Sequence, residues 1–191
     1  MNKHTNPLTK VRRADRAKDE AWIIDFLHRA AFGTLATSAD GQPFQHVNLF
    51  AYDETAQTLY FHTARAGRTR DNIEANPRVC ISFSEMGRLL PNTAAMEFSV
   101  EYASVAVFGN AHILEDPEEQ TRGLQLLMDK YFPHLQPGED YRGITAAELK
   151  RTAVYRIDIE AWSGKQKAAP PDFPGAFHYG TPPEMNEKEA P

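Results

Sequence analysis

The stretch LYFHTARAGRTR, residues 59–70, decides the interpretation of the fold. Its apolar first half predicts a short strand that ends at His62 and Thr63. The chain then turns at Ala66-Gly67 and enters an arginine-rich segment that predicts a helix start. A strand, a turn and a helix N-terminus beside cations can hold a phosphate group. Arginines can also simply begin a solvent-exposed helix, and the residues by themselves leave this choice open.

The segments around this stretch predict an antiparallel meander. Strands are expected at residues 32–38, 44–52, 58–63, 78–84, 96–114 and 152–162. Asp40-Gly41 is typical of a two-residue hairpin turn, and Gly109 indicates a bend or bulge in the long strand. Such short connections exclude parallel pairing of neighbouring strands. Because closure removes exposed edges, the pattern favours a mainly β fold, a six-stranded antiparallel β-barrel with peripheral helices.

Four helices and one domain complete the expected organisation. The helices are expected at 17–30, at 68–75, from Asp116-Pro117 onward, and after Thr145, which has capping-box spacing with Glu148. Residues 85–95 are expected to form a loop. The domain spans 17–165, after a flexible N-terminal arm at 1–16. A Pro-rich tail at 166–191 is expected to be partly disordered, above all in its last eight residues, or to pack on a partner subunit.

Composition and charge exclude several classes of function. The 191-residue chain carries a net charge of −5, which argues against a nucleic-acid-binding protein. Cys80 is the single cysteine, so no internal disulfide or thiolate metal site can form, and its apolar neighbours predict a buried, inert thiol. No apolar stretch reaches bilayer length and no signal segment is seen at the N-terminus. We therefore expect no membrane association and a cytoplasmic location.

Familiar catalytic and metal-binding motifs are not found. His46 and His62 have no carboxylate or cysteine at a useful spacing, so no metal site is expected. Neither Gly-x-Ser-x-Gly, Gly-x-Gly-x-x-Gly nor a Walker loop occurs. The last strand ends in Trp162-Ser163-Gly164-Lys165, where Trp162 and Lys165 could border a ring-and-phosphate ligand or could close the barrel end.

The order of these segments resembles the FMN-binding split-barrel family related to pyridoxamine 5′-phosphate oxidase, and within it the nitroimidazole-resistance (Nim) proteins. The resemblance rests on YFHT (60–63), Gly67-Arg68 and DNIEANPRV (71–79). It is supported by QHVNL (45–49), YASVAVFG (102–109), and KRTAVY (150–155) leading to WSGK (162–165). It covers about Trp22 to Lys165, and it implies a split barrel that forms a homodimer with FMN at the subunit interface.

The resemblance also implies which residues contact the flavin ring. Val47, Asn48 and Leu49 match the strand that lies beside the ring in that family. His62 and Thr63 match the following strand. His62 further matches a histidine associated with the Nim active site, which makes it the candidate catalytic residue.

The phosphate contacts and the partner contact are implied in the same way. Arg68 and Thr69 match an Arg-Lys phosphate pair, with Thr69 in place of the lysine and Arg70 as a candidate for compensation. Ser104 matches a polar flavin contact given by the other subunit. Gln45 stands where true oxidases have arginine, and their carboxy-terminal Arg-x-His motif is missing, so pyridoxamine phosphate oxidation is not expected.

An FMN-dependent oxidoreductase is the activity that the resemblance implies. NAD(P)H would reduce the flavin, and a small acceptor such as a nitroaromatic would receive the electrons, with His62 donating a proton or a hydrogen bond. The alternative is a protein that binds or carries flavin or haem without turnover. For haem, the candidate axial ligands are His46, His62, His112 and His178.

Overall fold

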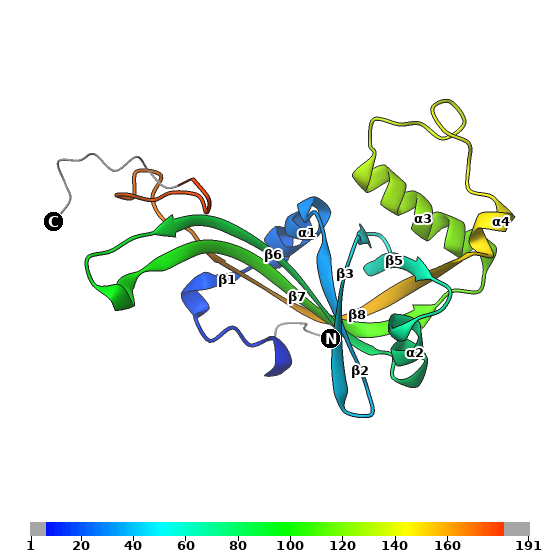
Figure 1. Cartoon of the computed structure of the whole chain (residues 1–191), viewed down its shortest axis with the longest axis horizontal. Coiled ribbons are helices and arrows are strands. Elements are labelled where there is room, and N and C mark those ends of the chain that lie inside the picture. Colours follow the sequence, from blue (N-terminus) through cyan, green and yellow to red (C-terminus); the bar gives the residue numbers. More distant parts are fainter. Residues whose placement is uncertain (1–6, 182–191) are drawn as a thin grey trace.

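A strongly curved antiparallel sheet with helices at its periphery dominates the computed structural model, which describes residues 7–181 (Figure 1). The strands are β1 (Ala17–Lys18), β2 (Gly33–Ala39), β3 (Gln42–Asn48), β4 (Ala51–Asp53), β5 (Thr58–Ala64), β6 (Arg78–Leu90), β7 (Ser99–Ile113) and β8 (Thr152–Lys167). The α-helices are α1 (Glu20–Arg29), α2 (Arg68–Ala75), α3 (Pro117–Tyr131) and α4 (Ala146–Leu149). Short 3-10 turns occur at η2 (Pro7–Thr9), η3 (Ala14–Arg16) and η4 (Ala95–Glu97).

The strand order shows where the barrel is open. Hydrogen-bonded neighbours follow the order β3-β2-β6-β7-β8-β5-β4, and β1 pairs with β8 outside this path. The two ends of the path, β3 and β4, are consecutive in the chain and are separated only by Leu49 and Phe50. The sheet therefore curls until its two edges meet without forming a ladder between them. This arrangement confirms the predicted mainly β, antiparallel split barrel.

Turn chemistry explains two of the predicted features. Ala39 pairs with Gln42, so Asp40 and Gly41 alone form the β2–β3 turn. Their φ angles of 50° and 76° are those of a type I′ hairpin turn, as predicted. The register of β7 against β8 shifts at Gly109, where a Cβ atom would collide with the Asp158 carbonyl oxygen. The predicted bulge at Gly109 is confirmed.

The number of strands differs from the prediction, since eight are present in the described chain where six were expected. One addition is the short β1. The other arises because the expected strand 44–52 divides at Leu49-Phe50 into β3 and β4. There the Asn48 carboxamide oxygen accepts the Leu49 N–H (2.9 Å), and the Tyr131 hydroxyl accepts the Phe50 N–H (3.2 Å). Side chains thus replace the strand partner at this point.

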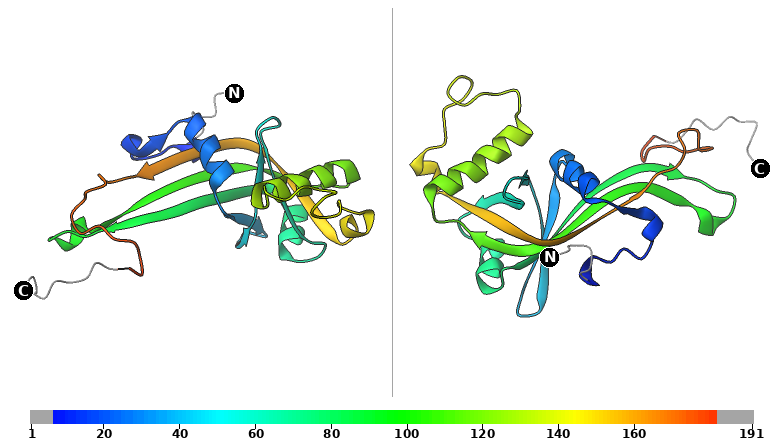
Figure 2. Two further views of the ribbon diagram at one scale, coloured as in Figure 1. Left: turned by 90° about the horizontal axis from the view of Figure 1, so that it is seen from above. Right: turned by 180° about the vertical axis from the view of Figure 1, so that it is seen from behind.

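The loop predicted at 85–95 is largely wrong, because β6 continues to Leu90. A register shift between Met86 and Leu89 absorbs Gly87, and the strand is held beyond it by an Arg88–Glu101 ion pair (2.8 Å). Gly87, which favoured the loop prediction, therefore lies in a bulge of the two-stranded ribbon formed by β6 and β7. Figure 2 shows this ribbon extending from the barrel.

The termini also differ in detail from the expectation. The first helix begins at Glu20 because the Asp19 carboxylate accepts the Trp22 N–H (2.9 Å). Part of the expected arm is ordered on the body, since η2, η3 and β1 lie before this helix. Part of the tail is ordered too, where the backbone of Phe177 pairs with that of Leu89. The last eight residues, for which disorder was expected, lie outside the described residues.

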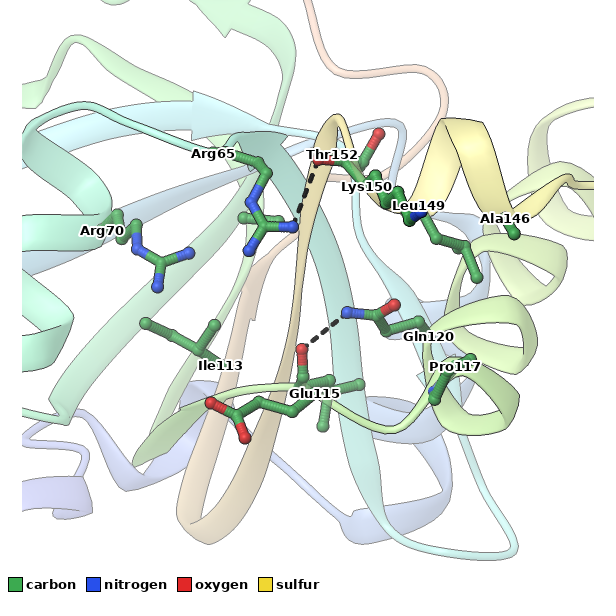
Figure 3. Close-up of a pocket in the computed structure, with 12 residues that line it drawn as sticks. Arg65, Arg70, Ile113, Glu115, Pro117, Gln120, Ala146, Leu149, Lys150 and Thr152 are labelled. Carbon is green, nitrogen blue, oxygen red and sulfur yellow. Dashed lines mark hydrogen bonds between the residues drawn. The ribbon is translucent and has the colours of Figure 1, made fainter.

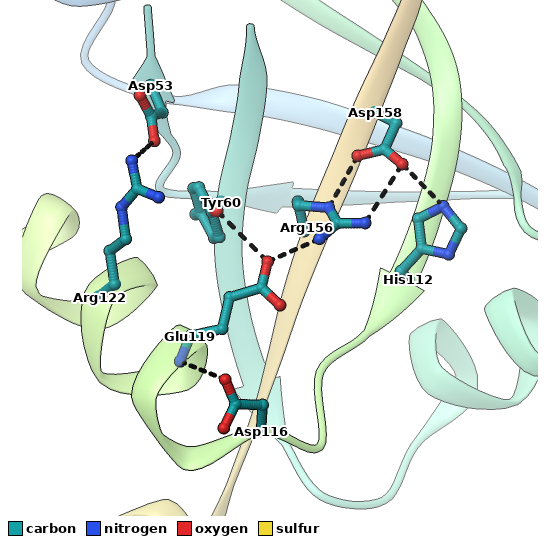
Figure 4. A network of polar contacts seen from close by, with 8 residues as sticks. All are labelled: Asp53, Tyr60, His112, Asp116, Glu119, Arg122, Arg156 and Asp158. Atoms are coloured by element: carbon teal, nitrogen blue, oxygen red, sulfur yellow. Dashed lines mark hydrogen bonds and ion pairs between the residues drawn. The ribbon is translucent and has the colours of Figure 1, made fainter. Parts of the chain in front are cut away.

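The core fills the curve of the sheet beneath α1. Its largest fully buried side chains are Trp162, Tyr60, Tyr155, Phe26, Phe50, Phe61, Phe83, Ile23, Leu27, Leu35, Leu59 and Ile81. Gly123 of α3 lies against the Tyr60 ring, where any larger residue would collide. An ionic network joins the same helix to the sheet, with Arg156 of β8 between Glu119 (2.7 Å) and Asp158 (2.7 Å) (Figure 4).

Lys130 of α3 fixes the point where β3 passes into β4. Its ammonium group donates to the carbonyl oxygens of Leu27 (3.0 Å) and Phe50 (2.9 Å). It therefore links the end of α1 to the crossing between the two sheet edges. Burial lowers the pKa of Lys130 to about 8.

This lowered pKa predicts a pH-dependent contribution to stability. The folded state loses the Lys130 proton near pH 8 and the unfolded state near pH 10.5, so the unfolded state binds more protons in between. The free energy of unfolding of the wild type should therefore rise, relative to Lys130→Met, between these two pH values. Urea unfolding of both proteins at pH 7.5 and pH 9.5 measures this difference. A difference that stays constant or falls would contradict the assignment.

Candidate functional site

The turn between β5 and α2 places an open helix N-terminus at the surface. Gly67 is the N-cap residue, with a φ of 137° that side-chain-bearing residues rarely adopt. It provides no side-chain acceptor, so the cap leaves the first-turn amides of α2 available to another acceptor. These amides and the helix dipole favour an anion at this point.

Two asparagines hold α2 on strand β2. The side-chain amide of Asn72 donates to the Thr37 hydroxyl (2.9 Å) in a buried contact. The side-chain amide of Asn76 donates to the Ser38 hydroxyl (3.1 Å) one turn later. Ile73 is buried on the same side of the helix. This docking fixes the direction of the helix and therefore the position of its open N-terminus beside β3.

Strand β3 presents alternate side chains to that helix. The Arg68 guanidinium carbon lies 5.2 Å from the centroid of the Phe44 ring, in a cation–π contact. Two residues further along, His46 Nδ1 lies 3.4 Å from the Thr69 hydroxyl oxygen. The opposite parity places Val47 and Leu49 outward, with 58% and 42% of each residue exposed. These two side chains therefore form an exposed apolar surface at the end of edge strand β3.

Asn48 bridges the open seam of the barrel. Its side-chain amide donates to the His62 carbonyl oxygen (3.0 Å) on β5. Its carboxamide oxygen accepts the Leu49 N–H at the same time. Asn48 thus connects β3 to β5 where the sheet has no hydrogen-bond ladder. The two strands that are predicted to contact the flavin ring are therefore linked at this point.

His62 and Thr63 lie on the β5 side of this seam. The His62 side chain is exposed, yet the protein atoms around it exclude enough water to lower its pKa below the ordinary 6.5. Its imidazole is therefore neutral at pH 7. The Thr63 hydroxyl donates to the Ala64 carbonyl oxygen (2.7 Å) and lies 3.0 Å from the Tyr155 hydroxyl.

Arg70 lies apart from Arg68. Its guanidinium pairs with Glu74 (2.8 Å) and lines a pocket of about 380 Å³ formed with Arg65, Ile113 and the start of α3. Figure 3 shows Arg65 and Arg70 on one side of this pocket and Gln120 on the other. Residues two apart on a helix point about 200° apart, which explains the divergence. Compensation by Arg70 for the lysine replaced by Thr69 is therefore not supported.

The structure places the remaining predicted residues away from the seam. Trp162 is a core residue, 1% exposed, in edge contact with the Tyr52 ring, so its side chain packs the barrel and is not free to border a ligand. Ser104 and Lys165 pair across β7 and β8 and line another pocket. Within one chain, the structure places Arg68 and Thr69 against the side of β3 that carries Phe44 and His46, and it brings Asn48 to the His62 carbonyl oxygen. Val47 and Leu49 point to the opposite side of this strand, and Ser104, Trp162 and Lys165 lie elsewhere.

Sequence reasoning missed several residues that shape the site. Phe44 supports Arg68, and Asn72 orients α2. The alternation of β3 could have placed Phe44, His46 and Asn48 on one face. No sequence signal indicates that Asn48 would reach β5, because that contact depends on the curl of the whole sheet.

Similar solved structures support the fold. The flavocytochrome Anf3 from Azotobacter vinelandii is 23% identical with a TM-score of 0.73, over 97% of this chain and 92% of that one. A proposed 5-nitroimidazole antibiotic resistance protein from Bacteroides thetaiotaomicron is 22% identical with a TM-score of 0.65, over 78% and 84%. A FAD and heme binding protein from Mycobacterium smegmatis is 21% identical with a TM-score of 0.72, over 82% and 76%.

The sequence also shows which family the chain belongs to. No curated protein matches the chain. In the described residues, no helix is long and apolar enough to cross a membrane. The model of the pyridoxamine 5′-phosphate oxidase family matches residues 19–166, which include every strand from β2 to β5, helix α2 and nearly all of β8. The chain therefore belongs to the pyridoxamine 5′-phosphate oxidase family.

Proposed function

We propose that this protein binds FMN at the seam between β3 and β5 and uses it as an oxidoreductase, with NAD(P)H as reductant and a small nitroaromatic-type acceptor. The observation that carries the proposal is that the open α2 N-terminus and Arg68 lie beside β3, and that Asn48 joins the end of this strand to β5 at His62. Two of the similar structures are described as a flavocytochrome and as a FAD- and haem-binding protein, which agrees with a flavin.

The phosphate of FMN would lie at the first turn of α2. The amides there have no side-chain N-cap acceptor, and the guanidinium of Arg68 is exposed beside them. Together they supply charge-assisted hydrogen bonds to a phosphate. Thr69 is buried and is 3.4 Å from His46, so it does not replace the positive charge of a lysine. Arg68 is therefore the principal cation of the phosphate site.

The ring of FMN would lie along the end of β3. Val47 and Leu49 offer exposed apolar surface, and Asn48 keeps an amide hydrogen beyond the one it gives to His62. Bound flavin would supply the hydride and electron transfer chemistry. The protein's own residues would hold its position at the seam.

His62 would act on the acceptor as a hydrogen-bond donor. Its lowered pKa keeps the imidazole neutral at pH 7, so one ring nitrogen carries a proton and the other accepts. The imidazolium form, which could donate a proton, needs a lower pH than for an ordinary histidine, because burial lowers the pKa of His62. A step that requires it would therefore become faster as the pH falls through the lowered pKa of His62.

A homodimer would complete this site. Ser104 lies on β7 in a different pocket of its own chain, so it can contact a flavin at the seam only from a partner subunit. The exposed Val47 and Leu49 would then be covered by that partner. Burial of such apolar surface favours association.

Replacement of Arg68 tests the phosphate site. Arg68→Ala should raise the Kd for FMN about ten- to hundredfold because it removes a charge-assisted contact. The Kd for riboflavin, which has no phosphate, should stay unchanged. Titration monitored by flavin fluorescence measures both ligands, with exposed Arg78→Ala as the matched control. Equal weakening of riboflavin and FMN, or weakening by Arg78→Ala, would contradict the phosphate assignment.

Replacement of His62 tests the acceptor contact. His62→Ala should lower kcat for reduction of a nitroaromatic about tenfold, while the FMN Kd stays within about threefold. His62→Gln should recover part of the loss because its amide also donates. Steady-state assays with NADPH measure the rates on FMN-loaded protein. Full turnover by His62→Ala would show that this residue has no part in the reaction.

A carrier without turnover is the other function to be distinguished. Of the four candidate haem ligands, His112 pairs with Asp158 (3.2 Å) and His46 contacts Thr69, whereas His62 and His178 are exposed. Oxidoreductase activity predicts that NADPH or NADH bleaches the bound flavin and that a nitro compound restores its absorbance. Flavin that stays oxidised with both reductants would instead indicate a carrier.

A further inference from the structure

The pocket of about 380 Å³ that Arg70 lines has no part in the proposed flavin site. Its walls come from the turn after β5, helix α2, the connection from β7 to α3, helix α4 and the start of β8 (Figure 3). Val47, Leu49, His62 and Arg68, which the flavin proposal uses, do not line it. The pocket is therefore a separate place in the fold where a ligand could bind.

Hydrogen bonds hold the α4 wall of this pocket in position. The Thr145 N–H donates to the Glu148 carboxylate (2.9 Å) in the capping box of α4, and Arg142 pairs with the same carboxylate (2.9 Å). At the other end of α4, the Arg65 guanidinium donates to the Lys150 carbonyl oxygen (3.2 Å). The wall is thus fixed to the turn after β5, and a ligand would not have to order it.

One side of the pocket carries a small excess of positive charge. Its lining cations are Arg65, Arg70 and Lys150. Glu74 pairs with Arg70 (2.8 Å), and Glu115 is the one carboxylate among the described lining residues. Three cations against two carboxylates leave a single positive charge. The Arg65 guanidinium also keeps N–H donors beyond the one that it gives to Lys150. This side can therefore bind an anion that carries one negative charge.

The other surfaces of the pocket are mainly apolar. Leu114, Leu149 and Ala153 are buried, and Ile113 is half-buried beside them. The one buried polar side chain among them, Gln120, donates to the Leu114 carbonyl oxygen (2.7 Å) and so satisfies the backbone there. An apolar group placed against these side chains would leave water without burying an unpaired backbone carbonyl.

The charges beside the pocket disfavour a phosphate ligand. The N-terminus of α3 lies next to it, but the Asp116 carboxylate already accepts the N–H groups of Glu118 and Glu119 (3.3 Å each). A phosphate dianion would therefore find no open first-turn amides from this cap, and it would meet the negative charges of Glu115 and Asp116. A carboxylate carries one charge and matches the fork of an arginine side chain.

We propose that this pocket binds a small organic monocarboxylate with an apolar body. The carboxylate contacts Arg65 and Lys150, and the apolar body lies against Leu114 and Leu149. The volume of the pocket is near the lower end of the roughly 300–1,000 Å³ that is usual for small-molecule sites, which suits a ligand about the size of benzoate. The proposal does not rest on flavin binding, because the two sites use different residues.

Calorimetric titration of the full-length protein with benzoate tests the pocket. Binding should be saturable and should weaken as salt is added. Benzamide has the same ring without the charge, and acetate has the charge without the ring. Each should bind at least about tenfold more weakly than benzoate, since each lacks one of the two contacts. Inorganic phosphate should also bind more weakly. No saturable binding of benzoate, or tighter binding of any of the other three compounds, would overturn the proposal.

Two pairs of variants locate the binding. Arg65→Met removes an exposed guanidinium of the pocket and should raise the Kd for benzoate at least about tenfold, whereas Arg151→Met removes an exposed cation outside it and should not. Ala146→Phe fills the pocket from an exposed position of α4 and should abolish binding. Ala147→Phe adds the same ring at the next exposed position, which does not line the pocket, and should leave the Kd unchanged.

Thermal unfolding of the four variants establishes that each is folded. Equal Kd values for Ala146→Phe and Ala147→Phe, or for Arg65→Met and Arg151→Met, would show that benzoate binds elsewhere and that the proposal is wrong.

Discussion

The hydrogen bond from the Asn48 side chain to the His62 carbonyl oxygen, 3.0 Å long, joins edge strand β3 to the part of β5 that lies beyond its pairing with β4. Neighbouring strands elsewhere in the sheet are joined by hydrogen-bond ladders, and between β3 and β5 the Asn48 side chain makes a connection where they have no ladder. Unpaired sheet edges invite association, and natural proteins usually cover them. Here the open edges are kept together and a ligand surface is left along them. The proposed flavin and the proposed partner subunit both use this surface.

Other parts of the fold position this seam. Lys130 and Tyr131 of α3 bind the backbone of Phe50, which stops β3 from continuing into β4. The hydrogen bond between Asn72 and Thr37 fixes α2 on β2, next to the seam. Because Gly67 caps this helix without a side chain, the first-turn amides of α2 stay available at the seam. Side chains from three separate elements therefore set the geometry, and a ligand meets a preorganised surface.

Local signals in the sequence predicted much of this structure. Helix α2 was predicted at its observed bounds, since Gly67 and Asn76-Pro77 limit it on both sides. The Asp40-Gly41 turn and the Gly109 bulge followed from glycine chemistry. Helical periodicity also explains why Arg68 and Arg70 diverge, although the initial prediction grouped them. The bridge from Asn48 to β5 and the burial of Trp162 depend on long-range curvature, for which the local sequence carries no signal.

Hydrogen–deuterium exchange, measured with and without FMN, tests most directly whether the seam is the flavin site. The account predicts added protection at the end of β3, the end of β5 and the first turn of α2, with protection of β7 around Ser104 if a partner subunit contributes. The pocket that Arg70 lines with α3 and α4 should remain unchanged. Protection concentrated at that pocket, or none at the seam with FMN bound, would contradict the account.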